Sequence, residues 1–386
     1  MIDYQKSRKI LAIASVVYIV VSLFLFIDHN DYTQYILQWE MYLAGTLDPT
    51  YPPVFSMLFA PLYAVWYRLP KLVFVCAFLV TMWQMHEHLF KHPDFAHISE
   101  QKKAWFILLF FVISPNCWWH VWTGLFDGLL GLFVFNMYLV LKNRTMRWVV
   151  KDAVLLVLIA LTMLIKFVGI FLLVPFLFFN LVQPKTGESE QDFACRRKKT
   201  FRIRLLVYVC GGASIGIAAI VLVDVSTILA PFVLQASRSY ESLYEFALYP
   251  NSPFFLKFFV DLYSRTGFYI FLIAMILVYV YCIKAKVSNE AWLLLPMLTF
   301  MTFFQVVHAQ FLLWILPLLG VYYAKHDGRT GRSHIRRHLF WIELIDGSVF
   351  FFLPFAQFMY TWVIAEVIKR ETSEKVAVPG VALSPA

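Results

Sequence analysis

Apolar segments long enough to cross a lipid bilayer recur along the whole chain, and they constrain its fold more than any other feature. A helix needs about 20 mostly apolar residues to cross a hydrocarbon core about 30 Å thick. Of the 386 residues, 61% are hydrophobic and 15% are charged, whereas soluble domains are about a quarter charged. The sequence therefore predicts an all-α integral membrane protein, a multi-pass helical bundle of about 11 transmembrane helices. The expected spans are residues 10–27, 71–90, 104–122, 125–141, 152–165, 167–182, 205–224, 267–284, 290–307, 309–324 and 346–368.

These segments leave no stretch large enough for a separate soluble domain, so residues 1–386 are interpreted as a single polytopic membrane domain. Four regions are expected outside the membrane core. They are a first external loop (28–70), a basic cytoplasmic loop (183–204), a long external loop (225–266) and a flexible C-terminal tail (369–386).

The distribution of Lys and Arg selects one orientation for the spans. The apolar segment 53–67 is interpreted as an interfacial helix within the first external loop, because reading it as a span would invert every later segment. With the N-terminus inside, the cytoplasmic segments hold 24 of the 33 basic residues, which is the bias that the positive-inside rule describes. This topology predicts that the C-terminus lies outside.

Net charge and cysteine content exclude two other classes of function. The net charge of +9 is explained by basic cytoplasmic loops, so no nucleic-acid partner is expected. The five cysteines include no CxxC pair, which argues against a disulfide framework and against a zinc site.

Polar and ionisable side chains gather on the outer face in this topology. An Asp or Lys inside a membrane costs about 2.5–3.5 kcal/mol on the insertion scale, so several on one leaflet are expected to pair or to bind a ligand. Singly, each has a structural explanation, such as a helix cap or a Lys that reaches the headgroups. The set comprises Asp28, Asp31, His120, Asp127, Lys166, Arg265, His308 and Gln310.

The sequence thus predicts a polar pocket that opens to the outer face. Its walls would be aromatic, although a stripe at helical spacing suits plain helix packing equally well. The stripe consists of Tyr32, Tyr35, Trp39 and Tyr42.

A carboxylate near the membrane surface, with cations below it, suits a lipid-linked phosphate substrate. The carboxylate would act as general base on an acceptor hydroxyl. Lys166, Arg265 and His308 would hold the donor phosphate through charge-assisted hydrogen bonds. A phosphate leaving group needs no proton, so one base suffices, unlike the paired carboxylates of glycoside hydrolysis.

Four motifs, in order along the chain, resemble a known family. They are "NDYTQY" with "LAGTLDPTYPP" (Asp31, Tyr32, Gly45, Asp48, Pro49, Tyr51, Pro52, Pro53), "SPNCWWHVWTGLFDG" (His120, Asp127), "IKFVGIFLLVP" (Lys166, Pro175) and "HAQFLLW" (His308, Gln310, Phe311, Trp314). Together they resemble the GT-C superfamily, and most closely its polyprenol-phosphate-mannose-dependent mannosyltransferases. The GPI mannosyltransferase I type and glycosyltransferase family 87 are the most similar groups.

The resemblance implies a GT-C-like fold and an inverting transfer of a sugar, with mannose expected, from polyprenyl or dolichyl phosphate to a lipid-linked or glycan acceptor. Asp31 would be the catalytic base and Asp28 the candidate second acid. Lys166, Arg265 and His308 would bind the donor phosphate. The residues expected to bind sugar or acceptor are Tyr32, Tyr35, His120, Asp127 and Gln310.

No metal site and no required cofactor are expected, with a divalent cation as the alternative. The expected partners are the sugar donor, its acceptor and membrane lipids, and a small membrane subunit is a further candidate. The plasma membrane of a prokaryote is favoured over the endoplasmic reticulum membrane, with the active site external or lumenal. Two other functions fit the same pocket: a transporter or flippase of a lipid-linked sugar, and a noncatalytic subunit of a glycosyltransferase complex.

Overall fold

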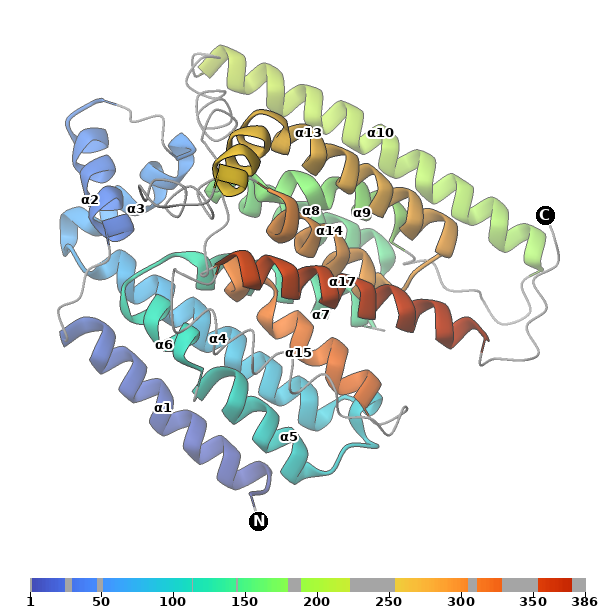
Figure 1. Cartoon of the computed structure of the whole chain (residues 1–386), viewed down its shortest axis with the longest axis horizontal. Coiled ribbons are helices and arrows are strands. Elements are labelled where there is room, and N and C mark those ends of the chain that lie inside the picture. Colours follow the sequence, from blue (N-terminus) through green and yellow to red (C-terminus); the bar gives the residue numbers. More distant parts are fainter. Residues whose placement is uncertain are drawn as a thin grey trace.

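The structure is a computed structural model, and the residues in its described ranges form helices joined by short turns (Figure 1). The ranges are residues 2–24, 30–46, 51–112, 114–143, 145–179, 189–222, 254–304, 311–327 and 353–376. The elements are α1 (Tyr4–Phe24), α2 (Asn30–Leu43), α3 (Pro53–Val65), α4 (Leu69–Lys91), η1 (Pro93–Phe95), α5 (Glu100–Ile107), η2 (Leu108–Val112), α6 (Pro115–Trp122), α7 (Asp127–Lys142), α8 (Trp148–Ile165), η3 (Phe167–Leu172), α9 (Leu173–Phe178), α10 (Glu190–Leu222), α13 (Phe254–Ala285), α14 (Asn289–Phe303), α15 (Leu312–Asp327) and α17 (Leu353–Val376).

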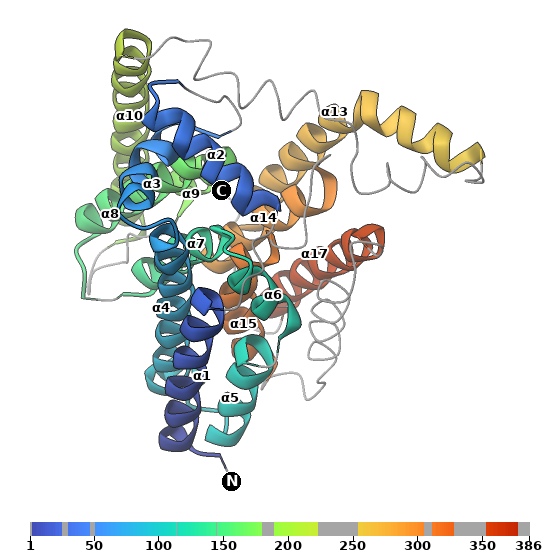
Figure 2. The ribbon, with the colours of Figure 1, turned by 90° about the vertical axis from the view of Figure 1, so that its left-hand side faces the viewer.

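The long helices run in broadly the same direction in Figure 1, and Figure 2 shows α13 and α17 tilted relative to α1 and α4. Ser7 contacts His86 at 2.9 Å and Tyr18, later in α1, packs on Phe78, earlier in α4, so α1 is antiparallel to α4. Gly128 lies against Phe78, and the Gln84 and Asn136 amides, later in both helices, are 3.2 Å apart, so α4 is parallel to α7. The bundle has two ends. At one of them, which we call the network end, α4, α7 and α15 stop and α14 starts. The opposite end, where α4, α7 and α15 start and α8 stops, is the aromatic end.

Four helical segments are long and apolar enough to cross a membrane. They are Tyr4–Phe24, Leu69–Lys91, Trp148–Ile165 and Arg265–Ala285. Large apolar side chains on their outer faces, such as Ile13 and Leu277, are more than half exposed, as expected where lipid and not protein covers a helix. The membrane character predicted from composition is therefore supported, and the count of about 11 crossings stays a prediction.

The helix boundaries differ from the predicted spans in several places. The span 104–122 is divided into α5, a π-helical turn and α6, and α6 restarts at Pro115 with the Ser114 hydroxyl accepting from the Cys117 amide at 3.2 Å. Part of the predicted cytoplasmic loop belongs to α10, which begins at Glu190. Part of the predicted external loop 225–266 belongs to α13, which begins at Phe254 and whose first half extends away from the other helices (Figure 2). Charged residues such as Lys, Arg and Glu are good helix formers, so hydropathy alone underestimates helix length.

The predicted direction of the last helix is wrong. The Glu371 carboxylate accepts from the Ser288 amide at 2.8 Å and from the Ser288 hydroxyl at 2.7 Å. The C-terminal part of α17 therefore lies at the network end, beside the start of α14, which the predicted topology places inside. In that topology the C-terminal end of the last span would lie outside, at the opposite end of the bundle from Ser288, and the contact between Glu371 and Ser288 contradicts this. Residues 369–376, assigned to a tail, continue α17, and residues 377–386 lie outside the described ranges.

The first predicted external loop contains two helices, α2 and α3, that lie together at the aromatic end (Figure 1). With 13 residues, α3 is about 20 Å long, too short to cross a hydrocarbon core. The Tyr63 hydroxyl on α3 donates to the Glu40 carboxylate on α2 at 2.6 Å, and this hydrogen bond raises the pKa of Tyr63 to about 12. The short length agrees with the interfacial assignment of residues 53–67.

The helices α7 and α15 approach each other closely at Gly131. A Cβ built on Gly131 of α7 would clash with the carbonyl oxygen of Leu313, a backbone atom at the start of α15. Only a glycine lets the two backbones approach this closely, as at small-residue interfaces in membrane bundles.

We therefore expect Gly131→Ala to lower the free energy of unfolding by about 1–3 kcal/mol, because an added methyl group must push α15 away. The thermal midpoint of the purified protein in detergent measures the effect. The matched control is Gly211→Ala on α10, where nothing lies within 4 Å of the added Cβ and where Ala favours the helix. Equal midpoints for the two variants would contradict the close approach of α7 and α15.

Candidate functional site

A tight turn between α6 and α7 brings distant segments together at the aromatic end. Gly124 in this turn has φ +85°, a conformation that favours glycine. A Cβ on Gly124 would lie 2.9 Å from the Tyr32 ring and 3.0 Å from the Lys71 side chain. The turn therefore rests directly on α2 and on the first residues of α4. The residues that follow the turn, Phe126 and Asp127, contact Lys166 and Trp314, respectively.

Lys166 lies between α8 and η3, as predicted, and its ammonium group is surrounded by three aromatic rings. Its Nζ is 3.9 Å from the ring centre of Phe311, 4.8 Å from that of Trp314 and 5.3 Å from that of Phe126. Such contacts stabilise a cation and more so where water is excluded. The half-buried ammonium group is thus enclosed by aromatic rings at the aromatic end.

Asp127 fixes one wall of this aromatic cage. It begins α7, is buried, and its Oδ1 accepts a hydrogen bond of 2.6 Å from the indole Nε1 of Trp314. The two residues are 187 positions apart in the sequence. Asp127 therefore acts on the site through Trp314, because its carboxylate holds the indole ring of Trp314 over Lys166. Asp127 was predicted to bind sugar or acceptor, and the hydrogen bond described for it positions Trp314.

The aromatic stripe of α2 packs into the protein. Tyr32, Tyr35 and Trp39 are buried, and their rings meet those of α3, such as Phe55 at 5.4 Å from Tyr35. The Tyr32 hydroxyl donates to the Tyr67 carbonyl at 2.8 Å. The stripe was predicted either to line a pocket or to pack helices together, and these contacts are helix packing. In this structure Tyr32 and Tyr35 are not exposed walls of a pocket, because aromatic neighbours cover both rings.

Two buried cations at the aromatic end were not predicted as site residues. Lys71 is 1% exposed, with its Nζ 5.6 Å from the Tyr32 ring centre. Arg68 is buried as well; it donates to the Leu23 carbonyl and lies over the Tyr67 ring. The signal was present in "YRLPK", which places two cations at the start of an apolar helix on the face already suspected of binding a ligand.

The remaining predicted site residues divide into three groups. Arg265 is on α13, 75% exposed, and pairs with Asp261 one turn earlier at 3.1 Å; no described contact joins it to Lys166. The backbones of Asp31 and His120 lie in α2 and α6, and their side chains are outside what the structure describes. Asp28, His308 and Gln310 lie outside the described residues.

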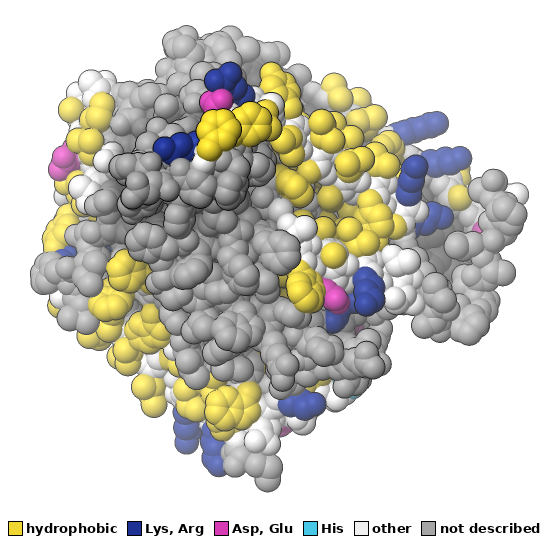
Figure 3. All heavy atoms as spheres, viewed as in Figure 1, with side chains coloured by type: hydrophobic (Ala, Val, Ile, Leu, Met, Phe, Trp, Pro, Cys, Tyr) yellow, Lys and Arg dark blue, Asp and Glu magenta, His cyan; other side chains and the backbone are white. Residues whose placement is uncertain are grey.

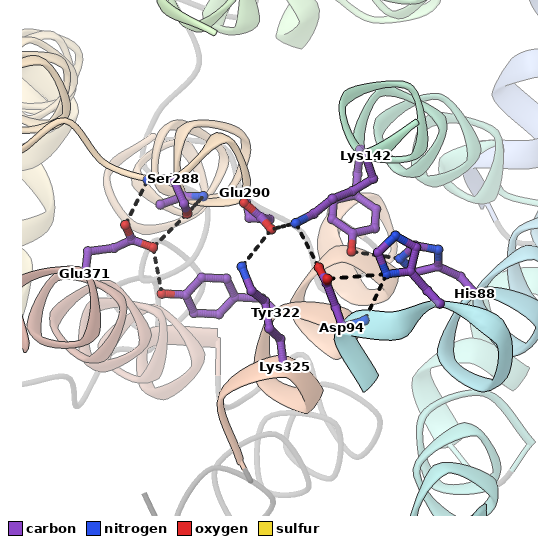
Figure 4. Close-up of polar contacts among 11 residues, drawn as sticks. His88, Asp94, Lys142, Ser288, Glu290, Tyr322, Lys325 and Glu371 are labelled. Atoms are coloured by element: carbon purple, nitrogen blue, oxygen red, sulfur yellow. Dashed lines mark hydrogen bonds and ion pairs between the residues drawn. The ribbon is translucent and has the colours of Figure 1, made fainter. Parts of the chain in front are cut away.

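The network end carries a second group of buried charges (Figure 4). The Glu290 carboxylate at the start of α14 accepts from Lys142 of α7 at 2.5 Å and from Lys325 of α15 at 3.1 Å. Lys142 also donates to Asp94 of η1 at 3.2 Å. Burial raises the pKa of Asp94, but the Lys142 ammonium more than offsets this and holds the pKa below its ordinary value. The pair therefore stabilises the fold at neutral pH, and the contribution is lost as the pH falls below about 4.

The same view shows two more links at this end (Figure 4). His88 Nε2 and the Tyr138 hydroxyl are 2.9 Å apart and join α4 to α7. The Tyr322 hydroxyl of α15 donates to the Glu371 carboxylate of α17 at 3.3 Å. Each charged residue of this group has a neighbour of opposite charge or a hydrogen-bond donor. These residues, which were not predicted as site residues, therefore hold helix ends together.

Within the described part of the chain, no group of three or more His, Cys, Asp or Glu side chains is arranged to hold a metal ion.

Comparison with known proteins identifies no family for this chain: no protein-family model matches it, and no curated protein does. Its function must therefore be argued from the residues that meet at the aromatic end.

Proposed function

We propose that this protein is an inverting glycosyltransferase that moves a sugar from a polyprenyl phosphate to an acceptor hydroxyl at the membrane surface next to the aromatic end. One observation carries the proposal. Asp127, Lys166 and Trp314 come from three of the motif segments that suggested this chemistry, and they contact one another directly or through one ring. They do so at the end of the bundle where α2, the helix of Asp31, begins.

In the proposed reaction the Asp31 carboxylate takes the proton of the acceptor hydroxyl. The acceptor oxygen forms a bond to the anomeric carbon of the sugar, and the bond from that carbon to the phosphate oxygen breaks on the opposite face. The electron pair of the broken bond leaves with polyprenyl phosphate, so the configuration is inverted and no acid is needed. Mannose as the sugar rests on the family resemblance alone.

The charge that develops on the leaving phosphate requires cations next to it. Lys166 is the first candidate because its ammonium group lies among three aromatic rings at the aromatic end, and a Lys side chain can hold a phosphate through charge-assisted hydrogen bonds. Lys71 is the second, because it lies on the other side of the same turn, against Gly124. A cation already fixed in position stabilises a developing charge without reorganisation at the moment of reaction.

The activity itself is tested with the purified protein in detergent, supplied with polyprenyl phosphates that carry different sugars and with lipid or glycan acceptors. Appearance of a glycosylated acceptor with inverted linkage, detected by mass spectrometry, supports the proposal. Movement of donor across a vesicle membrane with no glycosylated product would instead indicate a flippase.

We expect Lys166→Met to raise the KM for the donor about 10–100-fold, because a hydrogen bond to a charged group contributes about 1.5–3 kcal/mol. Lys166→Arg should recover part of the loss, because it keeps the positive charge. The control is Lys102→Met, an exposed Lys on α5 near the network end. An unchanged donor KM in Lys166→Met would exclude Lys166 as a phosphate ligand.

A further inference from the structure

A separate feature of the chain lies on α10, at the periphery of the bundle (Figure 1). Arg204 divides this helix into two parts. Its guanidinium makes two hydrogen bonds of 2.9 Å to the Asp152 carboxylate at the start of α8. It also donates to the Phe179 carbonyl at the end of α9 at 2.8 Å. Arg204 thus lies level with the start of α8 and the end of α9.

The part of α10 before Arg204 carries exposed cations. Lys198, Lys199 and Arg202 are exposed, whereas Thr200 and Arg204 are buried against the bundle. At about 100° per residue, the three exposed cations fall within an arc of about 100° on the side away from the bundle. In Figure 3, Lys and Arg side chains gather at the right-hand edge of the molecule, where this part of α10 lies, beside a broad hydrophobic area.

The part of α10 after Arg204 is apolar on the same outward side. Leu206 is 63% exposed and Val209 is 62% exposed, and both project in the direction of the cations. At 1.5 Å per residue, Lys198 lies about 12 Å from Leu206 along the axis. The outward face therefore changes from cationic to apolar over a distance that matches the step from the headgroup layer to the acyl chains of a bilayer.

We infer that the outward face of α10 around Lys198, Lys199 and Arg202 binds the headgroups of anionic phospholipids in the leaflet at the network end. The cations attract the phosphate, while Leu206 and Val209 contact the acyl chains of the same lipids. Basic residues beside a membrane segment contribute about tenfold in affinity for every one to two residues. The inference is independent of the proposed glycosyl transfer.

The test measures phospholipid binding to the purified full chain by native mass spectrometry, with phosphatidylglycerol and phosphatidylcholine as probes. The parent protein should retain phosphatidylglycerol in preference to phosphatidylcholine. The variant Lys198→Gln/Lys199→Gln/Arg202→Gln should bind phosphatidylglycerol about 100-fold more weakly. The three side chains are exposed, so the thermal midpoint should stay unchanged.

The matched control removes the same number of positive charges elsewhere at the network end, in Arg8→Gln/Lys102→Gln/Lys284→Gln. These three side chains are exposed on α1, α5 and α13. This variant should keep the parent affinity. The inference is overturned if the α10 variant binds phosphatidylglycerol as tightly as the parent, or if both variants lose binding equally, which would reflect total charge alone. Displacement by millimolar inorganic phosphate would also overturn it, because that result indicates a site for free anions.

Discussion

Replacing Asp31 with Asn is expected to reduce sugar transfer about 10²–10⁴-fold while leaving the donor KM and the thermal midpoint near those of the parent protein. The physical reason is that a carboxamide cannot accept the proton of the acceptor hydroxyl, and removal of a general base costs a factor of this size. Turnover is measured with the donor at saturation, so a change in kcat is separated from a change in donor binding.

Azide makes this experiment specific for a base. As an anionic nucleophile without a proton to lose, azide needs no base to attack the anomeric carbon. Asp31→Ala should therefore form the inverted glycosyl azide when azide is added, although it no longer uses the hydroxyl acceptor. Asp192→Asn, which removes an exposed carboxylate on α10, serves as the control and should keep full activity. Ordinary turnover in Asp31→Asn would eliminate the proposed mechanism.

Asp28→Asn decides whether a second acid contributes to the reaction. If Asp31 is the only base, this variant keeps most of the parent activity. A loss equal to that of Asp31→Asn would show that the two carboxylates act together.

Glu290→Gln is expected to destabilise the fold by about 3–5 kcal/mol, the typical cost of removing one partner of a buried ion pair. Its carboxylate is 5% exposed and contacts both Lys142 and Lys325. A neutral amide leaves both ammonium groups without their nearest counter-charge in a poorly hydrated position. The loss should appear in thermal unfolding in detergent, followed by circular dichroism.

An exposed pair provides the control for Glu290→Gln. Asp261 and Arg265 on α13 are 61% and 75% exposed, so Asp261→Asn should change stability by less than about 1 kcal/mol. The double variant Glu290→Gln/Lys142→Gln should lose less than the sum of its two single variants, because both remove the same contact. Additive losses, or a midpoint for Glu290→Gln equal to that of the control, would show that the buried network does not stabilise the bundle.

Helical character could be predicted from the sequence because it depends on local properties. Hydropathy over about 20 residues is enough to find α1, α4 and α8. The position of Lys166 between two helices follows from a single cation that interrupts an apolar run. Helix ends were predicted less well. In α10, for example, a segment rich in Lys and Arg continues the helix beyond its apolar part.

The candidate site was predicted only in part. Lys166 and Asp127 were predicted as unusual polar residues. The contact of Trp314 with both of them was not predicted. Lys71 was missed because its burial depends on contact with Tyr32 and with the turn at Gly124, and neither contact is visible in a local pattern. The pairing of a buried charge is decided by which helices pack together.

By itself, the sequence determined that this chain is built of helices, that several of them suit a bilayer, and where scarce polar residues interrupt them. Only the tertiary structure decided the direction of α17, the cage around Lys166 and the partners of Glu290. The reason is that hydropathy and helix propensity act over neighbouring residues, whereas these three features depend on contacts between residues tens to hundreds of positions apart.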